Sequence, residues 1–245
     1  MKILAIIPSY NEKISILREV VTETKKYVDK VLVIDDGSKE KLKLGFKGIT
    51  VLRNEPNKGK GYSLLRGLKY AVDNKYDVAI TLDGDGEHRP YEISQFLKKI
   101  KKYDFVVGQR KSYRSFKRKF LNSFATFWFA LLIPGIKDMY CGFRAIKIDS
   151  YKKMNLQGSG FELEPEMLLE SVKNNISIGY VNNETTPLNK TNLKAEDYLR
   201  TNELYDRWIL RNHRSLRVNF IKKSFLRFSA HTGLFITKII KWNQV

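Results

Sequence analysis

Apolar runs typical of β-strands alternate with helix-like segments along the first half of the chain. The expected strands cover residues 3–7, 31–34, 49–52, 78–82 and 105–107. Apolar residues at helical spacing occupy the intervals at 13–28, 64–72 and 90–101, the first with Asn11 as a candidate cap. Strands joined by helices of this length form right-handed crossovers and a mainly parallel sheet. The sequence therefore predicts an α/β fold with helices flanking the sheet.

The strand expected at residues 78–82 ends in two carboxylates, Asp83 and Asp85, with one glycine between them. Open α/β folds bind ligands at the carboxyl edge of the sheet, which is where these side chains are expected. Two aspartates there suit a hard divalent cation, which can hold the diphosphate of a nucleotide. A simple turn is the alternative, because Asp and Gly are also common turn residues. The motifs described below favour the ligand site.

Length and charge limit the possible functions. The 245 residues suffice for one sizeable α/β domain, with or without an appendage. The 45 Lys and Arg against 26 Asp and Glu leave a net charge of +19, which attracts nucleic acid, anionic membranes or phosphorylated substrates. Cys141 is the single cysteine, so an intrachain disulfide is excluded and a reducing compartment is favoured. The three histidines lack the spacing of zinc ligands.

A basic segment at 114–120 precedes an apolar and aromatic segment at 124–133. This pattern fits a helix at a membrane interface, and it equally fits a buried helix of the core. Both interpretations stay open. No uncharged stretch approaches the roughly 20 residues that a membrane-spanning helix requires.

The C-terminal segment interleaves basic and aromatic residues, which predicts a basic amphipathic helical tail. We expect a globular domain over residues 1–190 and this tail over 191–245. Lys and Arg would face anionic headgroups while Phe and Trp enter the acyl boundary, which docks the protein without spanning the membrane. A solvated helix packed on the domain is the alternative. Single-stranded nucleic acid is disfavoured as a partner, because no nucleic-acid motif accompanies the pattern.

Five further motifs follow strands or loops in a recognisable order. They are Pro-Ser-Tyr-Asn-Glu at 8–12, Asp-Asp-Gly-Ser at 35–38, Asn-Lys-Gly-Lys-Gly at 57–61, and the segments 138–145 and 160–166. Together with Asp83 and Asp85, this series resembles family 2 glycosyltransferases with the GT-A fold. Within that family it resembles the dolichol-phosphate mannose synthase and polyprenyl-phosphate glycosyltransferase group. The resemblance covers residues 1 to 185 and implies a nucleotide-diphospho-sugar transferase fold.

The resemblance implies a pocket for a nucleotide sugar. In this pocket Glu12 lies near the ribose, because a carboxylate accepts hydrogen bonds from ribose hydroxyls. Asp36 is the residue that recognises the base. Lys60 approaches the nucleotide between two glycines, which permit close contact of the backbone. The implied donor-binding residues are Pro8, Tyr10, Glu12, Asp35, Asp36, Lys60 and Asp83.

The resemblance also implies a divalent cation, Mg²⁺ or Mn²⁺. Asp85 is its principal expected ligand, Asp83 assists, and Glu87 adds a third carboxylate where mannose synthases often carry Gln. His88 follows as a neighbour rather than a ligand. Arg110 and Arg144 correspond to arginines near the donor or acceptor phosphates, which a guanidinium grips with two hydrogen bonds.

The implied chemistry is an inverting displacement at the anomeric carbon. A hydroxyl acceptor needs a general base, for which Glu162, Glu164 and Glu166 are candidates. A lipid phosphate is already ionised near neutral pH and needs no strong base, and Asp138 would then position the acceptor or Arg144. The residues expected to act in the reaction are Asp83, Asp85, Arg110, Asp138, Arg144, Glu164 and Glu166.

The expected function is metal-dependent transfer of a hexose from a GDP- or UDP-sugar to a polyprenyl (dolichyl) phosphate, by a peripheral protein at the cytoplasmic membrane face. One alternative acceptor is a hydroxyl of a glycan or glycolipid. A second alternative is a non-catalytic module that binds anionic membrane or nucleic acid. Residues 185–192 depart from the mannose synthases, which carry an Arg and a Ser-Lys pair there. Arg207-Trp208 resembles a motif of processive synthases, but Leu204 replaces their glutamine and argues against a polysaccharide synthase.

Overall fold

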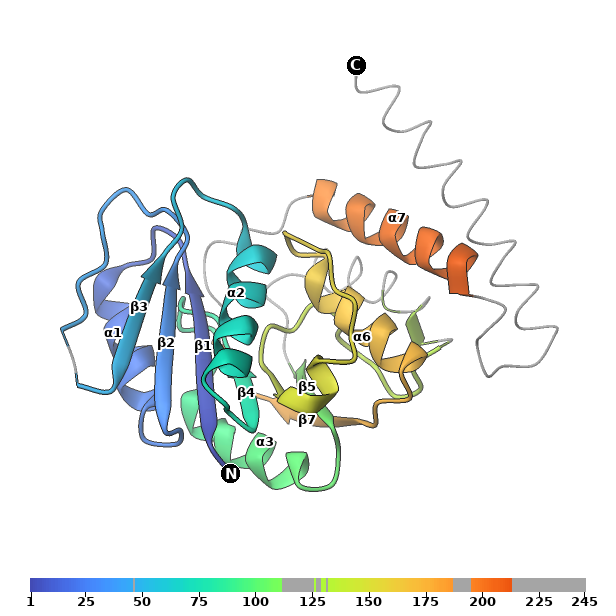
Figure 1. Cartoon of the computed structure of the whole chain (residues 1–245), viewed down its shortest axis with the longest axis horizontal. Coiled ribbons are helices and arrows are strands. Elements are labelled where there is room, and N and C mark those ends of the chain that lie inside the picture. The colour runs from blue at the N-terminus through green and yellow to red at the C-terminus, as the bar shows by residue number, and fades with distance from the viewer. Residues whose placement is uncertain (46, 112–125, 127–128, 131, 187–194, 213–245) are drawn as a thin grey trace, which may run out of the picture.

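The computed structural model describes residues 1–45, 47–111, 126, 129–130, 132–186 and 195–212 (Figure 1). The strands are β1 (Ile3–Ser9), β2 (Lys30–Asp35), β3 (Ile49–Arg53), β4 (Val78–Thr81), β5 (Phe105–Arg110), β6 (Arg144–Lys147) and β7 (Ile178–Asn183). The helices are α1 (Ile14–Thr24), α2 (Lys60–Asp73), η1 (Pro90–Glu92), α3 (Ile93–Ile100), α5 (Ile148–Tyr151), α6 (Leu163–Lys173) and α7 (Ala195–Asn212).

The strands form one sheet in the order β3-β2-β1-β4-β6-β5-β7. Neighbours from β3 to β4 are parallel, and so are β5 and β7. β6 is antiparallel to both of its neighbours, β4 and β5. The prediction of a mainly parallel sheet with flanking helices is confirmed. β6 and β7 are not among the expected strands. In β6 a charged residue stands at each end of the four-residue strand, so no apolar run marks it.

The direction of β6 brings a distant segment to the ligand edge of the sheet. Parallel strands end on the same edge, so the loops after β1, β2 and β4 meet there. Because β6 runs the opposite way, it begins at this edge, where Arg144 pairs with Thr81 of β4 and Val107 of β5. The preceding segment, 138–143, therefore reaches the edge too, and Thr81 Oγ1 donates a hydrogen bond to the Gly142 carbonyl at 2.7 Å.

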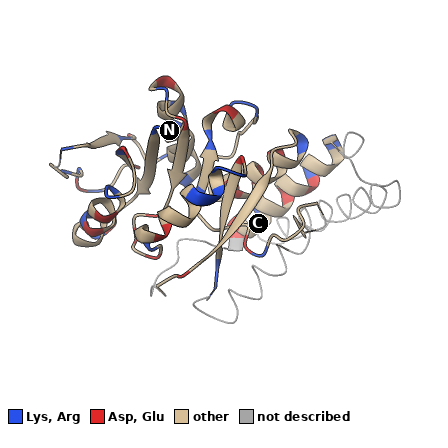
Figure 2. Cartoon of the chain, turned by 90° about the horizontal axis from the view of Figure 1, so that it is seen from below, with Lys and Arg blue, Asp and Glu red and all other residues tan. Residues whose placement is uncertain are grey.

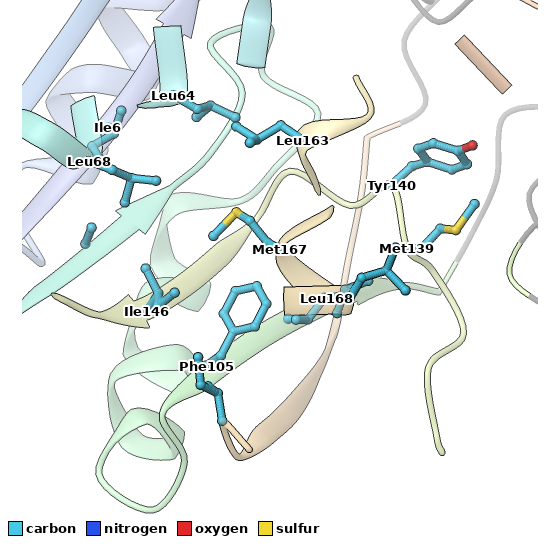
Figure 3. Close-up of a cluster of buried hydrophobic side chains, with 14 of the residues drawn as sticks. Ile6, Leu64, Leu68, Phe105, Met139, Tyr140, Ile146, Leu163, Met167 and Leu168 are labelled. Carbon is cyan, nitrogen blue, oxygen red and sulfur yellow. The ribbon is translucent and has the colours of Figure 1, made fainter. Parts of the chain in front are cut away.

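One hydrophobic cluster fills the space between the sheet and helices α2 and α6 (Figure 3). Gly67 of α2 has no Cβ, and a Cβ there would lie 2.4 Å from Ile6 Cγ2, so the helix packs directly on β1. Leu64 of α2 and Leu163 of α6 share this cluster and tie the two helices together. Burial of each such side chain contributes about 2 kcal/mol. The N-terminal ends of both helices are thereby fixed above the sheet.

A second cluster covers the opposite face, where α1 and α3 pack on alternate residues of the same strands. Phe143, which precedes β6, stacks on Phe96 of α3 with ring centroids 4.2 Å apart. The His88 ring lies 5.3 Å from the Phe143 ring. Charged residues lie mainly on helices and loops, while the strands carry few (Figure 2).

The loop after β1 differs from the prediction at Asn11. α1 begins at Ile14 with Lys13 at its N-cap position, and no side chain caps it. Asn11 has a φ of 54° and connects two loops instead. Its Oδ1 accepts a hydrogen bond from the Lys39 amide at 2.9 Å, and its own amide donates to Ser38 Oγ at 2.9 Å. The expected cap is wrong because these long-range partners are more favourable for Asn11 than the helix end.

Helix α7 is the described part of the expected C-terminal tail, and it lies alongside α6 (Figure 1). Tyr205, Trp208 and Ile209 are buried in the same cluster as α6. Trp208 Nε1 donates a hydrogen bond to Glu170 Oε1 at 3.1 Å. The domain boundary at residue 190 stays a prediction, and residues 213–245 lie outside the described part, as do most of 114–133. Among the helices that the structure describes, none combines the length and apolar character that crossing a membrane requires.

Candidate active site

Asp83, directly after β4, lies at the centre of a group of charged side chains. Its carboxylate is 2.7 Å from Lys60 Nζ and 3.4 Å from His88 Nε2. Burial alone would raise the pKa of Asp83, but the Lys60 ammonium and the His88 imidazole outweigh burial and hold it well below its ordinary value. Asp83 is therefore ionised, and it carries its negative charge at the edge of the sheet where ligands bind.

Lys60, the first residue of α2, joins Asp83 to a second carboxylate. Its Nζ lies 2.9 Å from Glu164 Oε1 in the first turn of α6, and Glu164 is only 2% exposed. Burial opposes the charged form of Lys60, yet Asp83 and Glu164 raise its pKa above the ordinary value. Three separate segments therefore meet at one ammonium group: the loop after β4, the start of α2 and the start of α6.

Gly142 makes this meeting possible, and it is a site residue that sequence reasoning missed. A Cβ at this position would lie 2.8 and 2.9 Å from the two carboxylate oxygens of Asp83, and 3.0 Å from Lys60 Nζ. Any side chain would displace one of the two groups. Its position as the single glycine of the 138–145 motif was the one available signal.

A cluster of negative charge surrounds Asp85. Asp85 Oδ1 accepts a hydrogen bond from the Glu87 amide at 2.9 Å. Burial and the neighbouring Asp83 raise the pKa of Asp85. Glu12, from the loop after β1, has its pKa raised to about 7 by burial and then by Asp85 and Asp83. Such mutual repulsion fits a site for a divalent cation at Asp83 and Asp85.

The carboxylates do not make a complete metal site by themselves. Within the described ranges, no three His, Cys, Asp or Glu side chains are grouped so that they could hold a metal ion. A cation at Asp83 and Asp85 would therefore need further ligands from a bound molecule. Mg²⁺ and Mn²⁺ are commonly bound in this manner, by one or two carboxylates together with phosphate oxygens of a substrate.

Asp35 and Asp36, at the end of β2, are buried and organise loops. Asp35 Oδ2 lies 2.5 Å from Arg53 Nη1, and its Oδ1 accepts a hydrogen bond from the Ser38 amide at 2.9 Å. Asp36 accepts hydrogen bonds from Asn54 Nδ2 at 2.8 Å and from the backbone amides of residues 58 and 59 at 3.0 and 2.8 Å. Contact of Asp36 with a nucleotide base stays a prediction. Arg53, the partner of Asp35, was not among the site residues predicted from the sequence.

Replacing Asp36 with Ala is expected to lower the free energy of unfolding by about 3 kcal/mol, because three hydrogen bonds to a buried carboxylate are lost. Urea unfolding followed by circular dichroism measures the change. Asp36→Asn keeps one acceptor oxygen, so it should lose less stability. Equal stability of Asp36→Ala and the unchanged protein would show that the loop does not depend on this carboxylate.

The other residues of the expected nucleotide pocket line the end of β1. Pro8 lies within β1 and is half-buried, while Tyr10 is 47% exposed in the following loop. Together with Glu12 they stand on the same edge as Asp83. The structure therefore brings the three residues to the site, although their contacts with a nucleotide stay a prediction.

Arg110, at the end of β5, is held by Asp138. Arg110 Nε donates to Asp138 Oδ2 at 2.5 Å and Nη2 donates to Oδ1 at 3.0 Å, while Nη1 lies 3.4 Å from Glu87 Oε1. Asp138 is fully buried. Asp138 was expected to position the acceptor or Arg144. The Asp138 carboxylate binds Arg110 instead of Arg144. Glu87 links this pair to the loop that carries Asp85.

Arg144, the first residue of β6, is fully engaged with the backbone. Its guanidinium donates to the carbonyls of Cys141, Met139 and Glu164 at 2.8, 2.6 and 2.5 Å. The side chain is buried, and the phosphate contact that the resemblance implies for it stays a prediction. Arg144 instead fixes the segment before β6 to the start of α6.

The three acids at the start of α6 divide into two sets. Glu162 Oε1 accepts from the amides of residues 159 and 160 at 3.0 and 2.9 Å. Glu166 Oε2 accepts from the amides of residues 157 and 158 at 3.0 and 2.8 Å. Four consecutive amides are thus held by two carboxylates, while Glu164 points to Lys60.

The loop that these acids hold packs against the beginning of α2. The Ser159 carbonyl accepts a hydrogen bond from the Tyr62 amide at 3.0 Å. A Cβ at Gly59 would lie 2.5 Å from this carbonyl oxygen, and a Cβ at Gly61 would lie 2.6 Å from the Gly160 carbonyl oxygen. The two glycines that flank Lys60 therefore allow a close contact between backbones, which places Lys60 between the loop and Asp83.

Several known proteins are similar to this chain in sequence. The family model described as Glycosyl transferase family 2 matches residues 4–154. An uncharacterized protein of Methanocaldococcus jannaschii is 34% identical over 194 residues, which cover 71% of this chain and 84% of the relative. The UDP-N-acetylglucosamine–dolichyl-phosphate N-acetylglucosaminyltransferase of Methanococcus voltae is 28% identical over 210 residues, with 73% and 83% covered. The undecaprenyl-phosphate mannosyltransferase of Micrococcus luteus is 27% identical over 194 residues, with 67% and 76% covered.

A solved structure shows the same fold. It is glucosyl-3-phosphoglycerate synthase from Mycobacterium tuberculosis in complex with Mn²⁺, UDP-glucose and phosphoglyceric acid, with a TM-score of 0.67 and 17% identity. The match covers 86% of this chain and 79% of that one. The chain belongs to glycosyl transferase family 2: it is a glycosyltransferase with the GT-A fold, and it resembles the dolichyl- and polyprenyl-phosphate glycosyltransferases of that family.

Proposed function

We propose that the protein transfers a hexose from a GDP- or UDP-sugar to a polyprenyl phosphate. The observation that carries this proposal is the charge pattern at the carboxyl edge of the sheet, where the half-buried Lys60 places its ammonium beside the acidic cluster of Glu12, Asp83 and Asp85. A diphosphate and a divalent cation together match this pattern. The relatives named as dolichyl- and undecaprenyl-phosphate transferases support a lipid phosphate as the acceptor.

The donor is proposed to lie along the ends of β1 and β4. Pro8, Tyr10 and Glu12 line the side of the nucleoside, with the Glu12 carboxylate accepting from the ribose. Asp35 and Asp36 hold the loops that shape the pocket, as their hydrogen bonds indicate. The Lys60 ammonium faces the diphosphate and balances part of its charge. A bound Mg²⁺ or Mn²⁺ at Asp83 and Asp85 would neutralise further charge on the leaving group.

The acceptor phosphate is proposed to attack the anomeric carbon directly. One of its oxygens forms the new bond to that carbon, while the bond to the donor diphosphate breaks and its electron pair leaves with the nucleotide. The configuration of the sugar inverts. Arg110, oriented by Asp138, stands at the end of β5 to meet the incoming phosphate. No proton has to be removed from an acceptor that is already ionised.

The location of the reaction follows from its acceptor. A polyprenyl phosphate resides in a membrane, and the chain has a net charge of +19 with which to approach an anionic surface. We place the protein at the cytoplasmic face, peripherally bound, where nucleotide sugars are available. This placement rests on the expected basic tail and on the single cysteine. It also requires that the acceptor is a membrane lipid.

The direct test incubates the purified chain with Mn²⁺ or Mg²⁺, a short polyprenyl phosphate and a panel of UDP- and GDP-sugars. We expect a sugar-bearing lipid from one donor, detected by mass spectrometry. The matched control replaces the lipid phosphate with the corresponding polyprenol, which should give no product. Product from the polyprenol or from a soluble glycan, with none from the phosphate, would move the acceptor to a hydroxyl. Failure of every donor to bind or react would overturn the proposal.

A further inference from the structure

The carboxylate of Glu164 lies inside the protein, next to the ammonium of Lys60. We propose that Glu164 is a positioning residue, which fixes Lys60 beside Asp83 and the donor diphosphate, and that it is not the general base of the reaction. This inference rests on the proposed function for the position of the diphosphate. The contact between the two side chains does not depend on it.

The geometry gives Glu164 one ion pair in the described part of the chain, and its charge also acts on the buried guanidinium of Arg144. Its Oε1 lies 2.9 Å from Lys60 Nζ, and no other ion pair of the described residues includes it. Only 2% of Glu164 is exposed. Lys60 has a second carboxylate, Asp83, at 2.7 Å. The ammonium is thus shared between one carboxylate on the ligand side and one on the interior side.

Buried charges constrain each other strongly. A buried carboxylate without a partner is unfavourable, because it has lost the water that stabilised its charge. Removing one member of a buried pair therefore destabilises the protein more than removing both members. Glu164 needs Lys60 for this reason. In return, its charge holds the ammonium against the attraction of Asp83.

The surroundings of Lys60 limit its freedom in the same way. Gly142 leaves no space for a side chain beneath the Asp83–Lys60 contact, as a Cβ there would be 3.0 Å from Nζ. Glu162 and Glu166 hold the loop that packs on Gly59 and Gly61. Glu164 completes this arrangement from the same helix turn. All three acids of the motif then serve to place one lysine.

A general base has to reach the proton of the acceptor. Glu162 and Glu166 each hold two backbone amides, and Glu164 is enclosed with Lys60. This assignment agrees with an acceptor that brings no proton to be removed. The Lys60 ammonium is already in place when the leaving diphosphate gains charge, so it does not have to reorganise. It therefore stabilises the transition state more strongly.

A double-mutant cycle tests the inference with Lys60→Met, Glu164→Gln and the two combined. Dissociation constants for UDP and for GDP are measured with Mn²⁺ by calorimetry, without any acceptor. Glu164→Gln should weaken binding of the preferred nucleotide about fivefold. In the Lys60→Met background it should change binding by less than about twofold, because Glu164 acts through Lys60. Asp73→Asn removes a carboxylate from an exposed lysine pair on the same helix, 3.0 Å from Lys69, and should leave binding unchanged.

Melting temperatures of the same variants give a second readout. Lys60→Met leaves a buried carboxylate without its partner, so it should melt lower than the double variant. In the transfer assay, Glu164→Gln should keep kcat within about threefold, whereas loss of a general base lowers it by about 10²-fold or more. Independent effects in the cycle, or a large loss in kcat alone, would overturn the inference. Coupling without any sugar-lipid product would defeat the transfer proposal and leave this one intact.

Discussion

Asp85→Ala is expected to reduce sugar transfer by about 10³-fold or more, because the variant lacks a carboxylate that would hold the cation at the leaving diphosphate. The substitution should not lower the melting temperature. Burial and Asp83 already raise the pKa of Asp85, and Asp85 in turn raises that of Glu12, so its removal relieves repulsion. Transfer rates beside melting curves measure both parts of the expectation.

The matched control for Asp85→Ala is Asp149→Ala, which removes a carboxylate that is 90% exposed on α5. It should retain full activity and stability. A titration with Mn²⁺ adds a further distinction, since the Asp85 variant should need more of the ion for any residual transfer. Full activity of Asp85→Ala at ordinary Mn²⁺ concentrations would remove Asp85 from the site.

Arg110→Met is expected to lower the free energy of unfolding by about 3–5 kcal/mol, because it takes away the guanidinium that binds both oxygens of the buried Asp138. Urea unfolding measures this change. Arg207→Met serves as the comparison. Arg207 is 2.6 Å from Glu203 on the surface of α7, and loss of such an exposed pair costs under about 1 kcal/mol.

Adding Asp138→Asn to the Arg110 variant should restore part of the stability, since the buried charge is then gone as well. The two substitutions together would be less harmful than their sum. Transfer activity should stay low in both variants if Arg110 meets the acceptor phosphate. If Arg110→Met were as stable as Arg207→Met, the Arg110–Asp138 pair would not stabilise the ligand edge of the sheet.

The position of the site was predictable because its signals are local. An apolar run that ends in Asp83 and Asp85 indicates both a strand and the edge at which it stops. The loops after β1 and β2 follow the same rule. Parallel strands bring their carboxyl ends together, so short motifs far apart in the sequence were correctly expected on one edge.

The partners of individual side chains were not predictable from such signals. Asp36 binds the amides of a loop more than twenty residues away, and Arg144 binds the carbonyl of Glu164. A sequence shows which groups carry charge, but not which of them neutralise each other after folding. Gly142 illustrates the limit, because its importance lies in the space that two other residues occupy. Family resemblance located these positions without revealing their contacts.

The antiparallel strand β6 has a consequence for how the molecule is divided. It is hydrogen-bonded between β4, which carries Asp83 to the ligand edge, and β5, which ends at Arg110. A chain that stopped after β5 would leave β4 with an open edge and without the Gly142 carbonyl that Thr81 binds. The part of the chain up to β4 is therefore not a separate folding unit. Its sheet is continuous with that of the following part through β6, so the two parts should be engineered and should unfold as one piece.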